Sequence, residues 1–170
     1  MQFNVASLLK EPTGSTRAYD IDDEAVIDGA KRRIVGHARF DRTPRGLVVR
    51  AELHGTMEGV CARCVKPVTY PVDLEIAEEY LPTIDVVSGA PVAPEEGGED
   101  AYRIDAHHVI DLTEAVAQYW ALALPMAPLC DEQCRGLCPV CGEEMAAAGH
   151  ACTGDQVDSR WAALARLKLG

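Results

Sequence analysis

Residues 130–152 read CDEQCRGLCPVCGEEMAAAGHAC, a stretch that holds five cysteines and a histidine within 23 residues. A second cluster, CARC, lies far upstream and contributes Cys61 and Cys64. Cysteine thiolate and histidine imidazole are ligands that zinc prefers, and a structural zinc site takes four ligands in a tetrahedron. The seven cysteines of the chain, together with His150, therefore make enough ligands for two complete sites.

Two CxxC pairs are the most specific part of this pattern. They are Cys61–Cys64 and Cys138–Cys141, and each can present two sulfurs to one ion from a single turn. Pro139 and Gly142 suit the second pair, because proline sets a tight turn and glycine accepts the positive φ angle that often follows the last sulfur. This pair is predicted to form a zinc knuckle.

The eight candidate ligands can be assigned to zinc sites in two ways. In the first division, one set of four forms a local zinc ribbon, and the other set of four ties the β region to the segment after the central helix. The ribbon set is Cys138, Cys141, His150 and Cys152, and the tying set is Cys61, Cys64, Cys130 and Cys134. The second division surrounds one ion with Cys130, Cys134, Cys138 and Cys141 and leaves CARC free. It closes smaller loops, which costs less entropy, but leaves three cysteines and a histidine without a role. We expect two Zn²⁺ ions, with one ion as the alternative.

Catalytic motifs are missing from the sequence. It contains no Gly-rich phosphate loop, no Ser–His–Asp arrangement and no HExxH motif. A zinc ion with four protein ligands has no open position for water, so it serves folding. CARC alone would suit a redox dithiol, but it lacks the βαβ surroundings of a thioredoxin-like motif. We therefore expect a protein that is not an enzyme and has no small-molecule substrate.

Strand patterns occupy most of the first two-thirds of the chain. They lie at Ile34–Arg39, Leu47–Leu53, Val68–Tyr80 and near Tyr102–Ile104. The first two are predicted to form a hairpin, and Pro71 requires an edge or a bulge in the third. Residues 88–100, SGAPVAPEEGGED, have almost nothing to bury and are predicted to be a mobile acidic loop.

The clearest helix begins within IDLTEAVAQYWALALP, residues 110–125. Asp111 is its predicted N-cap, Glu114 follows three residues later, and Pro125 ends it. The predicted buried stripe is Leu112, Val116, Tyr119 and Ala123.

The predicted fold class is α+β, an antiparallel β region with a central helix, a C-terminal zinc-ribbon-like segment and a short closing helix. The closing helix is expected at Asp158–Leu167. We expect residues 1–129 to form the β-plus-helix domain, and residues 130–170 to form the Cys-rich segment with its helix, packed on the first.

Charge is distributed unevenly along the chain. The formal net charge is −11, yet residues 31–50 hold seven Lys or Arg against one Asp, a local +6. Residues 71–105 hold ten acids against Arg103 alone, a local −9. The basic hairpin is the predicted contact for RNA phosphate, through Lys31, Arg32, Arg33, Arg39, Arg42, Arg45 and Arg50.

The N-terminus has no export-signal pattern, and the longest apolar run, Tyr119–Cys130, is 12 residues. A membrane span needs about 20 residues, so we expect no membrane association. We expect a cytoplasmic location, where thiols stay reduced and clustered cysteines more often hold metal than form disulfides.

Several stretches together resemble the YceD family, the large ribosomal RNA subunit accumulation proteins of bacteria and plastids. They are GVCARCVKPV, IDLTEAVAQYWALALPMAPLC, GLCPVCGEE and VDSRWAALARLK. The resemblance implies a metal-binding and nucleic-acid-binding factor in accumulation of large-subunit (23S) ribosomal RNA and in ribosome biogenesis. Many relatives carry Cys-x-Cys where this chain has His150-Ala151-Cys152, so the resemblance implies that His150 is either a substituted ligand or a bystander beside the site.

Three functional hypotheses follow. The first is a non-enzymatic factor that binds ribosomal RNA through the basic hairpin. The second is an adaptor whose zinc ribbons and acidic loop dock a basic ribosomal protein or an RNA-processing enzyme. The third is a redox-responsive zinc switch.

Overall fold

The computed structural model describes residues 1–93, 101–145, 150 and 160. The chain divides into two units, the first made of residues 1–57 and 69–125 and the second of residues 58–68 and 126–170. Among the described helices, none is long and apolar enough to cross a membrane.

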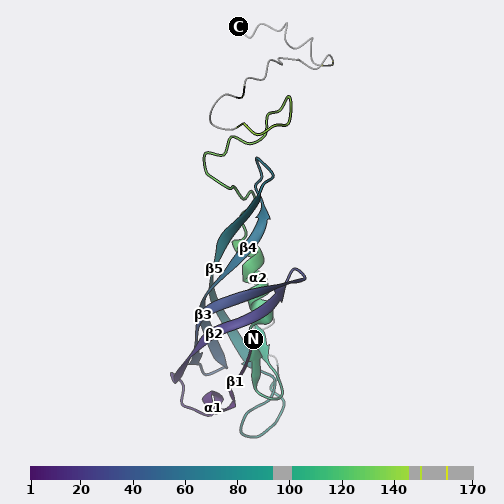
Figure 1. The fold of residues 1–170 in the computed structure, drawn as a ribbon. Helices are drawn as coiled ribbons and strands as arrows, with labels where there is room; N and C mark the ends of the chain where they lie inside the picture. Colours follow the sequence, from purple (N-terminus) through teal and green to yellow (C-terminus); the bar gives the residue numbers. More distant parts are fainter. Residues whose placement is uncertain (94–100, 146–149, 151–159, 161–170) are drawn as a thin grey trace, which may run out of the picture. The chain divides into compact units, whose positions relative to one another are not determined.

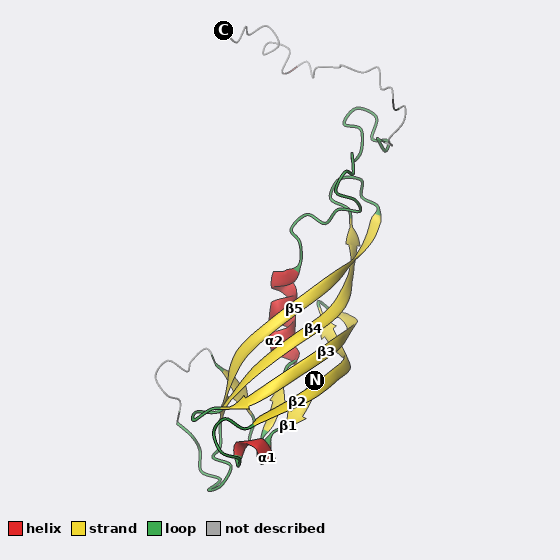
Figure 2. Cartoon of the chain, turned by 90° about the vertical axis from the view of Figure 1, so that its left-hand side faces the viewer, coloured by secondary structure: helices red, strands yellow, loops and turns green. Residues whose placement is uncertain are grey.

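Most of the first unit is β-sheet, with two short helices (Figures 1 and 2). The main sheet has the strand order β2-β3-β4-β5-β6, and β1 pairs with β7 in a second, two-stranded sheet. The elements are β1 (Gln2–Asn4), α1 (Ala6–Leu9), β2 (Thr16–Ile27), β3 (Ala30–Arg42), β4 (Leu47–Val60), β5 (Pro67–Pro82), β6 (Tyr102–Ile104), β7 (Val109–Asp111) and α2 (Thr113–Ala123).

The predicted hairpin is confirmed, and it is longer than its sequence pattern. Strands β3 and β4 pair antiparallel, with Arg39 opposite Arg50 and Phe40 opposite Val49. The sequence prediction missed β2, which pairs antiparallel with β3 from Ala30 to Asp41. Its polar face holds Asp20, Asp22 and Glu24, acidic residues that are unfavourable in isolated strands. Pairing with the basic β3 compensates, because opposite charges on neighbouring strands attract.

One part of the predicted antiparallel region is wrong. Strand β6 pairs with β5 in parallel, with Tyr80 opposite Tyr102 and Pro82 opposite Ile104, so the main sheet is mixed. The pairing covers only the last residues of β5, and Pro71 lies outside it. The expected edge or bulge at Pro71 stays a prediction.

Helix α2 is present as predicted, but its buried stripe is rotated. Its buried residues are Ala115, Val116 and Trp120, whereas Ala123 is exposed. Tyr119 is half-buried, and its hydroxyl donates to Glu78 Oε1 at 2.7 Å. The stripe therefore follows the i, i+4 row through Val116 and Trp120, which seats the larger indole in the core. The predicted N-cap is wrong by one residue, because the helix begins at Thr113 with Leu112 as its N-cap, while the carboxylate of Asp111 accepts from Thr113 N–H at 2.9 Å.

Trp120 is the largest fully buried side chain of the first unit, and Gly55 of β4 makes room for it. A Cβ built on Gly55 would lie 2.6 Å from Trp120 Cζ3 and 3.2 Å from Ile34 Cδ1. The guanidinium of Arg32 lies over the indole ring of Trp120, with its carbon 6.0 Å from the ring centroid. A glycine at this point of β4 is therefore a packing requirement.

Three expectations fall on residues outside the described part of the chain. They concern the closing helix Asp158–Leu167 apart from Arg160, the acidic loop from residue 94 to residue 100, and Cys152. The expected boundary between residues 129 and 130 stays a prediction.

Gly55→Ala is expected to lower the free energy of unfolding by about 1–3 kcal/mol, because the added methyl group collides with the indole. Urea denaturation of the purified variant measures this. The same substitution in a Trp120→Phe background should cost less, since the smaller ring vacates the space. Equal costs in the two backgrounds would contradict this packing account.

Candidate metal centre

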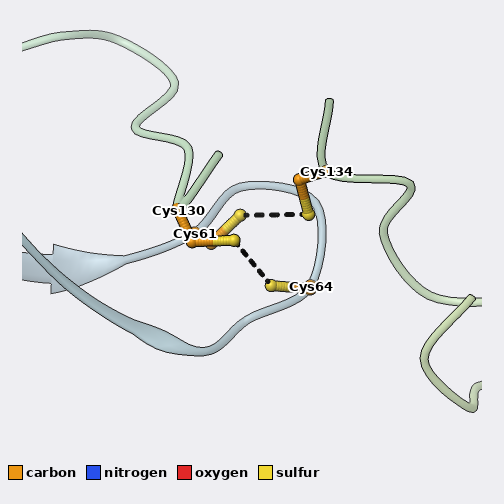
Figure 3. A group of neighbouring side chains, drawn as sticks. All are labelled: Cys61, Cys64, Cys130 and Cys134. Atoms are coloured by element: carbon orange, nitrogen blue, oxygen red, sulfur yellow. Dashed lines mark hydrogen bonds between the residues drawn. The ribbon is translucent and has the colours of Figure 1, made fainter. Parts of the chain in front are cut away.

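Four cysteines from two distant parts of the chain meet in the second unit (Figure 3). Cys61 and Cys64 lie in the loop between β4 and β5, and Cys130 and Cys134 lie after α2. The Sγ atoms of Cys61 and Cys134 are 3.8 Å apart, and those of Cys64 and Cys130 are 3.6 Å apart. All four lie within 4.8 Å of one another. A zinc ion at about 2.3 Å from each sulfur sets tetrahedral edges of about 3.8 Å, so this donor set fits Zn²⁺.

The backbone of the β4–β5 loop is shaped like a knuckle. Val65 N–H donates to Cys61 O at 2.9 Å, and Cys61 N–H donates to Lys66 O at 2.8 Å. Val65 has a φ angle of +60°, which is uncommon for a β-branched residue. Cys61 and Cys64 are 1% and 5% exposed. The turn therefore points two buried sulfurs in one direction.

Arg63 ties the second pair of cysteines to this loop. Its guanidinium donates to the carbonyl oxygens of Cys134 at 2.8 Å and Glu132 at 3.2 Å. Its own carbonyl accepts from Leu137 N–H at 3.2 Å. Gly136 lies so close that a Cβ there would be 2.9 Å from Arg63 O. Arg63 thus positions the second pair of cysteines, a role that the sequence prediction missed. The sequence feature that could have indicated this role is the location of Arg63 between the two cysteines of CARC.

A second group of ligands lies further along the same unit. Cys138, Cys141 and His150 have ligand atoms within 4.8 Å of one another, and Cys141 Sγ is 3.4 Å from His150 Nε2. Gly142 N–H donates to Cys138 O at 2.8 Å, and Gly142 has a φ angle of +74°. The backbone therefore has the predicted tight turn. Cys152, the predicted fourth ligand, lies outside the described residues.

This grouping follows the first of the two predicted divisions. All four members of the tying set lie together, and so do three members of the ribbon set. Cys130 and Cys134 group with CARC rather than with the knuckle pair. The identity and number of bound ions stay predictions.

The thiols in both groups have strongly perturbed acidities. Backbone N–H groups of Cys130 and Cys64 donate to Cys61 and lower its pKa to about 6. Backbone N–H groups of Cys141 and Val140 lower the pKa of Cys138 to about 6 in the same way. Hydrogen bonding to neighbouring thiols, Cys64 first, raises the pKa of Cys130 to about 12. The cysteines thus share protons, which a metal ion would replace on binding.

Lys66 places a positive charge beside the four-cysteine group. Its ammonium pairs with Glu144 at 2.6 Å. The hydrogen bond to Glu144 and the charges of Cys64 and Cys130 raise the pKa of Lys66. A zinc ion bound by four thiolates carries a net charge of −2, so an adjacent ammonium would partly offset it.

The second unit has little apolar material to hold it together. Within its described residues, the buried hydrophobic side chains are Cys61, Cys64 and Cys138. Val68, Leu129 and Met145 are half-buried, and the exposed apolar side chains include Val60, Val65, Met126, Leu137 and Val140. A unit of this kind resembles small domains that depend on a metal or disulfides for stability.

Five of the seven basic residues predicted to contact RNA are paired with acids of the same sheet. Lys31 lies 3.5 Å from Glu24, and Arg33 makes a bidentate pair with Asp22 at 2.8 Å. Asp22 has a lowered pKa because Arg33 donates to it. Further along the sheet, Arg39 and Arg50 both bond to Asp41, and Arg45 lies 3.8 Å from Glu79.

The other two predicted RNA contacts have structural partners. Arg42 donates to the backbone carbonyls of Leu9 and Gly46 at 3.2 and 2.9 Å, and to that of Thr43. Arg32 faces the opposite side of β3 and lies over Trp120. The seven basic residues are therefore spread over several environments, although the exposed side chains of Lys31, Arg33, Arg39 and Arg50 remain within reach of a partner.

Comparison with known proteins gives one family and a few relatives. Residues 49–168 match the family model described as large ribosomal RNA subunit accumulation protein YceD. Uncharacterized proteins of Mycobacterium bovis and Mycobacterium tuberculosis are 30% identical over 130 residues, which is 76% of this chain and 59% of theirs. An uncharacterized protein of Mycobacterium leprae is 30% identical over 127 residues, 74% of this chain and 55% of its own. This chain therefore spans less than two-thirds of the length of these relatives. No solved structure matches it.

Zinc content tests the four-cysteine group directly. Wild-type protein is expected to bind two zinc ions per chain, and Cys61→Ser is expected to bind one, because serine oxygen is a poor replacement for thiolate. Metal analysis of purified protein measures this. Ala62→Ser is the matched control, since it places a hydroxyl in the same loop without removing a sulfur. One zinc ion in both the wild type and Cys61→Ser would contradict the division.

Proposed function

Since this chain belongs to the YceD family of large ribosomal RNA subunit accumulation proteins, we propose that it is a non-enzymatic, zinc-stabilised factor in accumulation of that RNA. The observation that carries the zinc part is the meeting of four cysteine sulfurs in a unit whose described residues bury little else. Such a unit needs a cross-link, and metal binding supplies folding free energy outright.

In this proposal, zinc has a structural role. Cys61, Cys64, Cys130 and Cys134 would hold one ion, and Cys138, Cys141, His150 and Cys152 would hold the other. Bound zinc would supply charge and fixed geometry to thiolates that otherwise repel one another. Four protein ligands at each ion leave no position for a substrate water, which supports a role without catalysis.

Docking to a basic protein is the favoured route to the ribosomal RNA. The net charge of −11 favours a basic partner over a polyanion. The neutralisation of Arg33, Arg39 and Arg50 by carboxylates on the same sheet supports this reading, because a phosphate would have to compete with those carboxylates. The partner would be a ribosomal protein or an RNA-processing enzyme.

Direct RNA binding is the second candidate, and the exposure of two cations favours it. The side chains of Lys31 and Arg33 are 76% and 71% exposed, so their pairing partners screen them only partly. Arginine can exchange a carboxylate for a phosphate with the same forked geometry. The redox switch is a third hypothesis, for which zinc retention in peroxide is the test.

Loss of the four-cysteine site should impair the cellular role. In cells that lack the native protein, Cys61→Ser/Cys64→Ser is expected to restore less large-subunit ribosomal RNA than the wild type, relative to small-subunit RNA. Quantitative hybridisation measures the ratio at matched protein levels, with Ala62→Ser as control. Full restoration by the double variant, with its zinc lost, would rule out a role for this site.

The two routes to RNA make different predictions for Lys31→Ala/Arg33→Ala. If the protein docks to a protein partner, accumulation of ribosomal RNA should be unchanged. If the outer face contacts RNA directly, affinity for RNA should fall and the slope of log K against log salt should decrease by about 2. Electrophoretic mobility shifts over a salt series measure this. Glu52→Ala/Glu75→Ala on the same exposed face is the control for non-specific charge effects.

A further inference from the structure

A hollow of about 750 Å³ lies in the first unit, beside β6 and the start of α2. Its walls include the aromatic residues Tyr80 and Tyr102 and the polar residues Glu114 and Gln118. None of them belongs to the cysteine groups or to the basic hairpin. The hollow is thus separate from every site that the sequence pattern predicted.

Two tyrosines form the aromatic wall. The rings of Tyr80 and Tyr102 are stacked, with centroids 5.1 Å apart and planes inclined by 20°. Tyr102 donates from its hydroxyl to Gln118 Oε1 at 2.7 Å, which fixes its ring. Tyr80 is 1% exposed, and within the described part of the chain its hydroxyl has no hydrogen-bond partner. The Tyr80 hydroxyl has almost no accessible surface, so this wall offers a ligand the Tyr102 ring rather than the Tyr80 hydroxyl.

The hollow is electronegative. Among the described residues that line it are three carboxylates, those of Asp105, Asp111 and Glu114, and one cation, Arg103, with the Met1 ammonium beside Asp111. Burial raises the pKa of Tyr80 first, and the charges of neighbouring groups, Asp111 and Glu114 among them, raise it further. The field of these carboxylates therefore reaches the aromatic wall. A phosphate would be repelled here, whereas a cation would be attracted.

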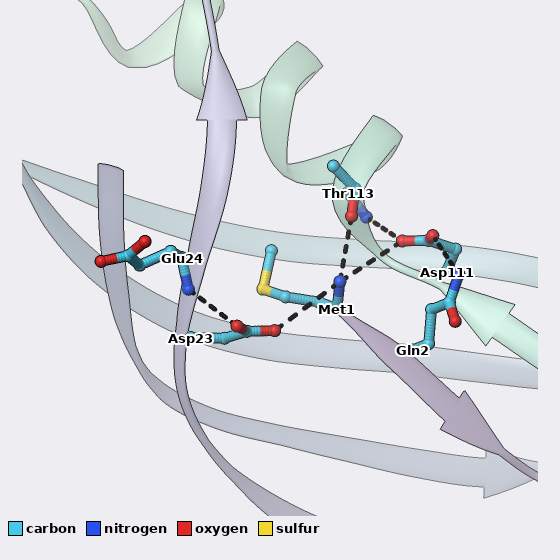
Figure 4. Close-up of polar contacts among 6 residues, drawn as sticks. All are labelled: Met1, Gln2, Asp23, Glu24, Asp111 and Thr113. Atoms are coloured by element: carbon cyan, nitrogen blue, oxygen red, sulfur yellow. Dashed lines mark hydrogen bonds and ion pairs between the residues drawn. The ribbon is translucent and has the colours of Figure 1, made fainter. Parts of the chain in front are cut away.

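The three carboxylates differ in the number and length of the hydrogen bonds that they already accept. Asp111 accepts from Thr113 N–H at 2.9 Å and from Gln2 Nε2 at 3.1 Å, and the amino group of Met1 lies 3.6 Å away (Figure 4). Asp105 accepts from two backbone N–H groups at 2.9 and 2.7 Å. Glu114 accepts a longer bond of 3.4 Å from Gln118. Glu114 is thus the carboxylate best able to take a new partner.

We propose that this hollow binds an arginine side chain from a basic protein segment, with its guanidinium against the Tyr102 ring and paired with Glu114. A guanidinium is planar, stacks on aromatic rings and forms charge-assisted hydrogen bonds to carboxylates, so it satisfies both walls at once. The proposal rests on the protein-docking part of the proposed function and identifies the chemistry of the partner.

Binding of a short peptide to the full-length, ¹⁵N-labelled protein tests this. The probe is an acetylated, amidated glycine pentapeptide with one central arginine, and the comparison peptide carries citrulline, which keeps the shape and removes the charge. The arginine peptide is expected to shift the amide resonances of Tyr102, Glu114 and Gln118. The citrulline peptide is expected to bind about five- to tenfold more weakly.

Matched variants decide the outcome. Glu114→Gln should weaken the arginine peptide about five- to tenfold, and Glu75→Gln, an exposed glutamate of β5 outside the hollow, should leave it unchanged. Tyr102→Leu should weaken it as well, and Glu114→Gln carries the test if that variant does not fold. Equal binding of both peptides, no effect of Glu114→Gln, or displacement of the peptide by a uridine oligonucleotide would each overturn the proposal. Ribosomal RNA levels in cells with Cys61→Ser/Cys64→Ser test the proposed function separately.

Discussion

The second unit depends on contact between sulfur atoms that are far apart in the sequence. Cys61 and Cys134 are 73 positions apart, yet their sulfurs lie 3.8 Å from each other. The described residues around them bury no large aliphatic side chain, so the hydrophobic effect has little area on which to act. The knuckle turn at Val65 and the hydrogen bonds of Arg63 orient the sulfurs. These contacts do not replace a core, and the four sulfurs are close enough to hold a metal ion that would.

The first unit is stabilised in a different way. Trp120 and the strands it packs against form a conventional apolar core. Gly55 has no side chain, which leaves the space that the indole occupies. The outer face of the same sheet is held by charge pairing, such as the bidentate pair of Arg33 and Asp22. Exposed pairs of this kind contribute little to stability, but they determine the electrostatic surface that a partner meets. A locally basic stretch thereby becomes part of a mixed-charge face.

Sequence reasoning succeeded where the signal was local. The β3–β4 hairpin, the start of α2 to within one residue, and the knuckle turn with Gly142 were all predictable, since each depends on residues a few positions apart. It failed where partners are distant. Strand β2 was missed because its acidic residues are favourable only beside β3, and the buried stripe of α2 was misplaced because Trp120 is selected by space beneath Gly55.

The sequence by itself determined the family, the candidate ligands, the main hairpin and the central helix, because motifs and periodicity are properties of neighbouring residues. Tertiary structure decided which cysteines meet, that Cys130 and Cys134 join CARC, and that Arg33, Arg39, Arg45 and Arg50 of the predicted RNA-binding residues face carboxylates. It also decided that Tyr80, Tyr102 and Glu114 line one hollow. The physical reason is that strand register and loop closure bring together side chains whose separation along the chain carries no information about their distance in space.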